Sequence, residues 1–186
     1  MTLSMKQLSE TYYDTLTKSL KTITDKTFAV LLGNSYMVSQ NSAIDALDIA
    51  APLTYHVTTP DTLYQAHLEA AVSVGAAAII EVFEDDGNAA HFDVSAGDAV
   101  IPINRNRNSA NVSAFTVASG VTVTQATADV LIYSRRVGGV LGSSGNFPED
   151  GIILKLNTQY LIRVLSDADN NEGSLGLTWH ELLTLA

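Results

Sequence analysis

The stretch from residue 152 to residue 182, IILKLNTQYLIRVLSDADNNEGSLGLTWHEL, decides the fold class. It contains three apolar segments of strand length, 152–156, 160–165 and 174–182, with clusters of turn-forming residues between them. In the last segment Leu175, Leu177 and Trp179 alternate with polar residues. Because alternate residues of a strand share a face, we expect Trp179 in the core rather than exposed as a platform for a sugar.

The same pattern continues upstream of this stretch. Residues 64–74 alternate between apolar and polar side chains, which favours a strand, although their alanines leave a helix as the alternative. Further short segments are of strand length and apolar or alternating, and 121–133 reads as one long strand or two. They are 28–32, which 36–38 could pair with, and 53–58, 77–83, 98–103 and 112–118.

Many short strands separated by turns predict an all-β protein with an antiparallel β-sandwich or jelly roll. Residues 138–151, rich in Gly, Ser, Asn and Pro, predict a long loop. Apolar residues recur at steps of three or four over residues 3–25, which predicts a helix, either packed on the body or reaching to a neighbour. We therefore divide the chain into an N-terminal helical or extended arm, 1–27, and a β-sandwich domain, 28–186.

Composition limits the functions that the chain can serve. Its 20 acidic residues exceed its 10 basic residues, giving a net charge of -10, which disfavours nucleic acid as a partner. The absence of cysteine excludes disulfides, cysteine zinc sites and thiol nucleophiles. No apolar run is long enough for a transmembrane helix, and the N-terminus lacks the apolar core of a signal peptide. We expect no membrane partner and no secretion.

Residues 101–111, IPINRNRNSAN, form the most distinctive polar run. Asn and Ser side chains bond readily to nearby backbone, so the run predicts an ordered loop that presents Arg105 and Arg107. Guanidinium groups pair with carboxylates in a fork-like geometry, which makes this loop a contact point for another protein or, alternatively, a solvated hairpin loop. Arg135 and Arg136, after Tyr133, would form one basic patch with it if both sites lie at the same end of the sandwich.

Motifs for catalysis or metal binding are weak. The pairs His67 with Glu69 and His91 with Asp93 could each share a strand face, but a third ligand for a transition metal is missing. The turn at 167–173 resembles the opening of a calcium loop, yet its glycine is at the wrong position and Thr178 replaces the bidentate Glu. No nucleophile motif or phosphate-binding loop occurs. We expect no cofactor and no metal.

Three motifs in order carry a family resemblance: the run at 100–109, ILKLNTQYLIRV at 153–164, and LTWHE at 177–181. Together with the turn at 58–62 they resemble small virion proteins of tailed bacteriophages, over about residues 53 to 182. That family has an Asn-Arg-Asn-Arg-Asn-Ser-like run, a Leu-Lys-x-Asn-Thr-x-Tyr strand pair and a closing Trp-Tyr-Glu or Trp-His-Glu strand. The Trp-His-Glu ending and the Ala-rich segment 66–78 are the departures of this chain.

The resemblance implies a capsid decoration (cement) protein or a related head-associated protein, with a β-sandwich fold and no catalysis. It implies the major capsid protein as partner, together with copies of the chain itself in a homotrimer or a dimer. The alternatives are a head-fibre or tail-associated jelly roll that binds host glycans or another virion protein, and a hydrolase with a cryptic carboxylate pair. We expect the capsid or neighbour contacts at Asn104, Arg105, Asn106, Arg107, Asn108, Arg135, Arg136, Tyr12 and Leu16.

Overall fold

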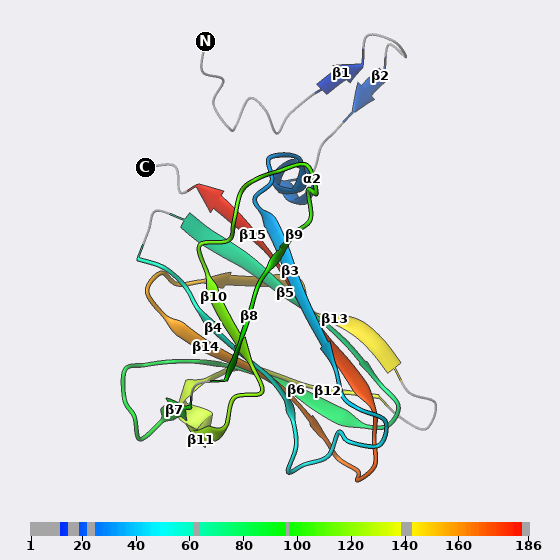
Figure 1. Ribbon diagram of the computed structural model, residues 1–186, viewed down its shortest axis with the longest axis vertical. Coiled ribbons are helices and arrows are strands. Elements are labelled where there is room, and N and C mark those ends of the chain that lie inside the picture. The colour runs from blue at the N-terminus through cyan, green and yellow to red at the C-terminus, as the bar shows by residue number, and fades with distance from the viewer. Residues whose placement is uncertain are drawn as a thin grey trace.

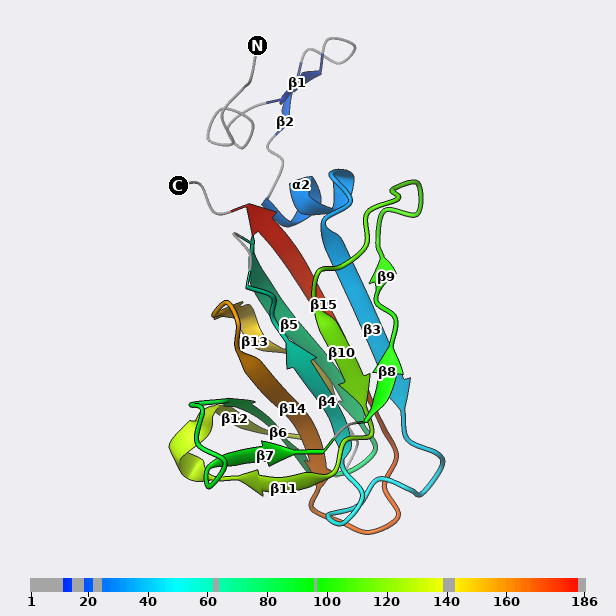
Figure 2. The ribbon, with the colours of Figure 1, turned by 60° about the vertical axis from the view of Figure 1, so that its left-hand side comes forward.

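A computed structural model describes residues 12–14, 19–21, 25–61, 64–95, 97–138 and 143–183 of the chain. They form an all-β body in which two antiparallel sheets pack face to face (Figure 1). The helix α2 (Asp25–Leu31) lies over one end of this sandwich, as both views show (Figure 2). No helix in the described residues has the length and apolar character needed to cross a membrane.

One sheet has five strands in the order β13-β5-β15-β3-β9. Every neighbouring pair is antiparallel, and β15 lies between β5 and β3. The strands are β3 (Ser35–Asn41), β5 (Tyr64–Val74), β9 (Ile103–Asn104), β13 (Ser143–Leu154) and β15 (Gly173–Leu183).

The other sheet has six strands in the order β12-β6-β14-β4-β10-β8. The two sheets share a connection at one edge, where the chain leaves β8, turns at Pro102 and enters β9. The strands are β4 (Leu53–Thr58), β6 (Ala78–Glu84), β8 (Asp98–Val100), β10 (Thr116–Ser119), β12 (Leu131–Val137) and β14 (Gln159–Ser166).

The core follows the alternation seen in the sequence. In β5, Leu68, Ala70 and Val72 are buried while the residues between them face outward. Trp179 of β15 is 1% exposed and lies against Tyr36 and Phe115. The strand prediction for 64–74 and the core position of Trp179 are therefore confirmed.

A smaller two-stranded sheet pairs β7 (Phe92–Val94) with β11 (Val123–Ala126). It covers the outer face of the six-stranded sheet, where Phe92 packs in a second apolar cluster with Phe83 and Leu161. The short 3-10 helix η1 (Ala128–Val130) follows β11 and adds Val130 to that cluster. Burying this outward-facing apolar surface stabilises the lobe that β7, β11 and η1 make.

Several sequence expectations for the N-terminal region are wrong. The chain is extended in β1 (Tyr12–Asp14) and β2 (Ser19–Lys21), which pair with each other, so one helix does not span 3–25. The segment is rich in threonine and tyrosine, which favour strands. The run at 28–32, expected to be strand-like, instead lies at the end of α2. The helix stops there because Gly33, at φ 74°, ends it with the bonds Gly33 N to Val30 O and Asn34 N to Ala29 O.

Other boundaries also differ from the sequence prediction. The expected loop at 138–151 contains the first part of β13, which continues to Leu154. That strand pairs with β5 in spite of its glycine and proline because its register shifts between Phe147 and Ile152, at an irregularity of the kind that tolerates such residues. The segment 98–103 is divided between β8 and β9, and 112–118 forms a strand only from Thr116.

Candidate interaction surface

The loop that follows β9 is braced by its asparagine side chains. Asn104 Nδ2 donates to Gly33 O at 2.8 Å, and Asn106 Nδ2 donates to Leu31 O at 3.0 Å. Asn111 Nδ2 donates to Leu32 O at 3.2 Å. The last carbonyls of a helix lack intrahelical partners, and here the loop supplies the donors. The loop and the C-terminal end of α2 are therefore one structural unit, visible beside α2 in Figure 2.

Bonds within the loop complete this bracing. The backbone N–H of Asn106 donates to Asn104 Oδ1 at 2.9 Å, and that of Asn108 donates to Asn106 Oδ1 at 3.1 Å. These are the local side-chain-to-backbone bonds that the sequence predicted for this run. Asn104 and Asn106 therefore act as braces, whereas the side chain of Asn108 forms no hydrogen bond with the described residues and is exposed.

Glu181 anchors the far side of the same loop. It is 4% exposed at the end of β15, and its carboxylate accepts bonds from Ser113 Oγ at 2.5 Å and from the Ala114 N–H at 3.2 Å. Trp179 Nε1 donates to the same carboxylate at 3.1 Å. Buried charges need such partners. The sequence did not point to this role, although Glu181 stands two residues after Trp179 and so shares its inward face.

Arg105 and Arg107 project from this braced loop, and both are exposed. Among the described residues neither guanidinium has an ion-pair or hydrogen-bond partner. The other basic side chains that the structure describes are all engaged: Lys26 with Glu69, Lys155 with Glu84, Arg136 with Asp167, Arg163 with Glu81, and Arg135 in a further interaction. These two arginines are thus unpaired cations on a chain with a net charge of -10.

Large apolar side chains are exposed around the two arginines. Leu31 is 60% exposed, Leu32 is 47% exposed and Val112 is 84% exposed. The bonds from Asn106 and Asn111 to the carbonyls of Leu31 and Leu32 hold these residues next to the loop. We call Leu31, Leu32, Arg105, Arg107 and Val112 the loop surface. Apolar side chains beside arginine are typical of protein interfaces.

The remaining predicted contact residues do not join the loop surface. Arg135 and Arg136 lie in β12, the edge strand of the six-stranded sheet opposite β8, whereas Arg105 follows β9, which connects to β8. The condition for a single basic patch, that both sites lie together, is therefore not met. Arg136 instead pairs with Asp167 at 2.5 Å. Tyr12 lies in β1, where its side chain is not described, and Leu16 lies outside the described residues.

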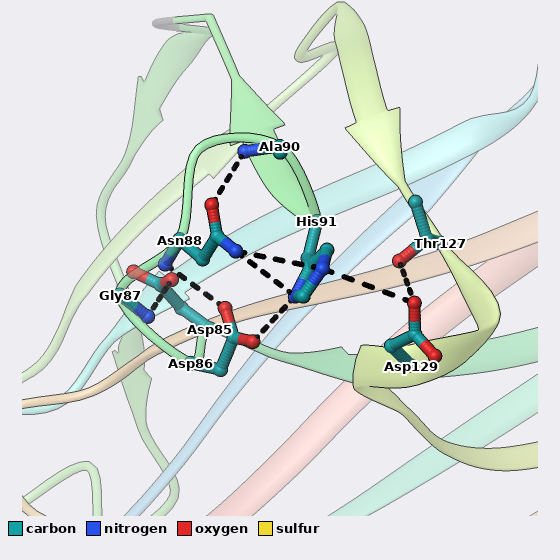
Figure 3. A network of polar contacts seen from close by, with 8 residues as sticks. All are labelled: Asp85, Asp86, Gly87, Asn88, Ala90, His91, Thr127 and Asp129. Carbon is teal, nitrogen blue, oxygen red and sulfur yellow. Dashed lines mark hydrogen bonds and ion pairs between the residues drawn. The ribbon is translucent and has the colours of Figure 1, made fainter.

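A second polar cluster lies in the loop between β6 and β7 (Figure 3). His91 Nδ1 is 2.7 Å from Asp86 Oδ2, and His91 Nε2 is 3.9 Å from Asp129 Oδ2. The hydrogen bond to Asp86 raises the pKa of His91, and the same bond lowers the pKa of Asp86. Thr127 N also donates to His91 O at 3.0 Å, so the cluster ties this loop to the chain after β11.

The residues considered for metal binding have other roles. In the turn at 167–173, Asp167 pairs with Arg136, and Asn171 is buried, with Nδ2 donating to Ser166 Oγ at 2.9 Å and Oδ1 accepting from Ala76 N at 2.8 Å. Asn170 has φ 58°, a turn conformation. Within the described ranges no group of three His, Cys, Asp or Glu residues could hold a metal ion.

Comparison with known proteins adds no relative. No family model matches the chain, and no curated protein or solved structure matches it either.

Proposed function

We propose that this chain is a structural virion protein that binds the outside of an icosahedral phage capsid and bridges neighbouring capsomers. The loop surface carries the proposal, because two unpaired arginines and three exposed apolar side chains stand on a braced loop. A loop that is already ordered before binding loses less conformational entropy when the partner binds, which favours binding. The family resemblance of 100–109, 153–164 and 177–181 supports the same role.

The strand order supports a jelly roll, the architecture that we propose for the body. Without β8, β9 and β10, the sheets read β3-β15-β5-β13 and β4-β14-β6-β12. Eight strands that alternate between two four-stranded sheets in this way correspond to a jelly roll, a fold found in viral capsid proteins. A fold does not by itself determine function, so the jelly-roll order supports the proposal only in combination with the loop surface.

The proposed action is adhesion without turnover of a substrate. A shell that presents many copies of one site lets weak single contacts sum by avidity, and a homotrimer would hold three loop surfaces at once. Clamping adjacent capsomers would raise the free energy needed to separate them under the pressure of packaged DNA. Trp179, buried and bonded to Glu181, offers no ring face to a glycan, which weighs against the alternative of a sugar-binding module.

The test is occupancy on purified capsids that lack this protein. Replacing Arg105 and Arg107 together by Ala should weaken binding about tenfold or more, since loss of interface arginines commonly costs over 1 kcal/mol each. Arg136→Ala is the matched control, because Arg136 lies at another sheet edge and is already paired with Asp167. Gel densitometry of sedimented particles measures occupancy. Equal occupancy for the double variant and the control would reject the assignment of the loop surface.

A further inference from the structure

A hollow of about 250 Å³ opens on the outer face of the five-stranded sheet, beside Arg105. Its floor comes from three neighbouring strands, in which Met37, Thr178 and Glu69 are direct cross-strand partners. The alternation of β3, β5 and β15 turns all three side chains away from the core. The lining residues are Met37, Glu69, Ala70, Ala71, Arg105 and Thr178.

Arg105 borders this hollow because of its place beside the sheet. Its backbone N–H donates to Ser35 O at 2.9 Å, which extends the pairing of β9 with β3 by one residue. Ser35 is the cross-strand partner of His180, which in turn is the partner of His67. One row across the sheet therefore carries Arg105, Ser35, His180 and His67, next to the row that floors the hollow.

The charges around the hollow favour an anion. Glu69 is its one carboxylate, and the Lys26 ammonium pairs with it. Arg105 has no partner among the described residues, so a positive charge remains. Burial lowers the pKa of His180. The positive charges of Arg105, His67 and Lys26 lower this pKa further, whereas the carboxylate of Glu69 raises it. His180 therefore feels the basic groups of this face.

Two buried polar atoms in the adjacent row also lack partners. Ser35 Oγ and His180 Nδ1 form no hydrogen bond with the described residues, although Ser35 is 0% exposed and His180 is 2% exposed. Buried polar groups are nearly always hydrogen-bonded, so unpaired ones need an explanation. Both atoms are buried beneath the surface, so the exposed Arg105 guanidinium is the donor that this face offers to a ligand.

We propose that this hollow receives a carboxylate side chain from an acidic segment of a partner protein, with Arg105 as the residue that binds it. The guanidinium offers a planar pair of donors that matches a carboxylate. Met37 and Ala71 line the hollow and would pack against the aliphatic part of a glutamate, and Thr178, also a lining residue, carries a hydroxyl that can donate a further bond. This inference rests on the proposed function only in taking the partner to be a protein.

Phosphate fits the hollow less well than carboxylate. The chain has a net charge of -10, and Glu69 lies in the hollow itself, so a dianion meets more repulsion than a single carboxylate. The apolar lining also gives phosphate nothing to pack against, whereas a glutamate stem gains from it. A protein segment is therefore the occupant that the hollow favours.

The test uses the isolated full chain and capped tripeptides. Acetyl-Glu-Leu-Glu-amide is titrated while NMR follows the Arg105 Nε–Hε and Met37 methyl signals, and acetyl-Gln-Leu-Gln-amide serves as the neutral control. We expect saturable shifts with the acidic peptide, at least about tenfold weaker binding with the neutral one, and loss of binding in Arg105→Gln. Arg136→Gln, remote from the hollow, should bind as the unchanged protein does.

Three results would overturn the inference: no saturable shift at Met37, equal binding of the two peptides, or tighter binding of inorganic phosphate than of the acidic peptide. The peptide experiment and the capsid experiment can fail independently of each other. Peptide binding with unchanged capsid occupancy in the Arg105→Ala, Arg107→Ala variant would reject the loop surface as the capsid contact and leave the carboxylate site in place. Reduced occupancy without peptide binding would leave the function in place and reject the carboxylate site.

Discussion

Glu181 is a buried carboxylate that serves as a structural joint. It ties the loop before β10 to the last strand of the five-stranded sheet through Ser113, Ala114 and Trp179. A charged acceptor with several donors forms strong hydrogen bonds inside a protein. Removing it would leave the donors without partners, and that loss costs more than the bonds themselves contribute.

We therefore expect Glu181→Ala to lower the free energy of unfolding by about 3 kcal/mol in urea denaturation, since it leaves several donors unsatisfied in a buried site. Glu181→Gln keeps one acceptor oxygen and should cost about half as much. Ser113→Ala, which removes one donor and keeps the carboxylate, is the control. A loss below about 1 kcal/mol for Glu181→Ala would show that the loop does not depend on this joint.

His91 is a second residue whose chemistry can be tested. Its pKa is raised by the bond to Asp86, so its contribution to stability is complete below its ordinary value of 6.5 and is lost as the pH rises through the raised pKa. The pKa of Asp86 is lowered, so its contribution is present above 3.8 and is lost as the pH falls through the lowered pKa. The pair should stabilise the loop most between these two ordinary values.

Replacing Asp86 by Asn should return the pKa of His91 toward its ordinary value, as followed by NMR of the imidazole Cε1–H. The unfolding temperature of the unchanged protein should exceed that of Asp86→Asn by more at pH 5.5 than at pH 8. Asp129→Asn is the matched control, because Asp129 is farther from His91 and makes the smallest contribution to its pKa. A larger effect of Asp129→Asn than of Asp86→Asn would contradict the geometry in Figure 3.

The junction between α2 and the loop surface depends on Gly33. Its φ of 74° ends the helix, and a Cβ there would lie 2.1 Å from Ser109 Oγ. A side chain at position 33 would therefore be destabilising for two reasons: the backbone is in the left-handed region, and another segment approaches closely. Gly87 has a similar φ of 81° but nothing within 4 Å of the place where its Cβ would lie.

This pair of glycines separates the two costs. Gly87→Ala should lower the free energy of unfolding by about 1 kcal/mol through backbone strain alone. Gly33→Ala should cost about 2 kcal/mol more, because Ser109 must move. Hydrogen exchange should also quicken in 104–111 for Gly33→Ala and stay unchanged there for Gly87→Ala. Equal costs for the two variants would mean that the loop yields freely and does not brace the arginines.

Elements with clear alternation were predictable, and those whose state depends on distant partners were not. The strand at 53–58 and the last two strands follow from their own residues. The run at 28–32 reads as apolar in either state, and only the Gly33 end signal with its bonds back to Val30 and Ala29 distinguishes the helix. The first half of β13, which contains Gly145 and Pro148, is a strand because β5 pairs with it.

The candidate site shows the same division. The sequence predicted an ordered loop that presents Arg105 and Arg107, because Asn and Ser bond to nearby backbone. It did not predict that the amide groups reach the carbonyls of Leu31, the last residue of α2, and of Gly33 just after it, more than seventy residues earlier in the chain. It allowed Arg135 and Arg136 to join that loop if both sites lay at one end of the sandwich, and only the strand order shows that β12 is at the opposite sheet edge from β8. Sheet edges are set by long-range pairing, which local pattern does not encode.

Charge is unevenly distributed over the molecule. Ten basic and 20 acidic residues would suggest a uniformly acidic surface. Ion pairing neutralises Lys26, Lys155, Arg136 and Arg163, which leaves Arg105 and Arg107 as the described cations without partners. A partner with exposed carboxylates would therefore be attracted to one end of an otherwise repulsive body.

The central position of β15 has a consequence for biosynthesis. This strand joins β3 to β5, and the N–H of its first residue, Gly173, bonds to Ser42 Oγ across 131 residues. A ribosome therefore releases β3 and β5 long before it makes the strand that unites them. Nascent chains should remain open to proteases and chaperones until β15 has emerged, and closure over such long sequence separations should make maturation slow.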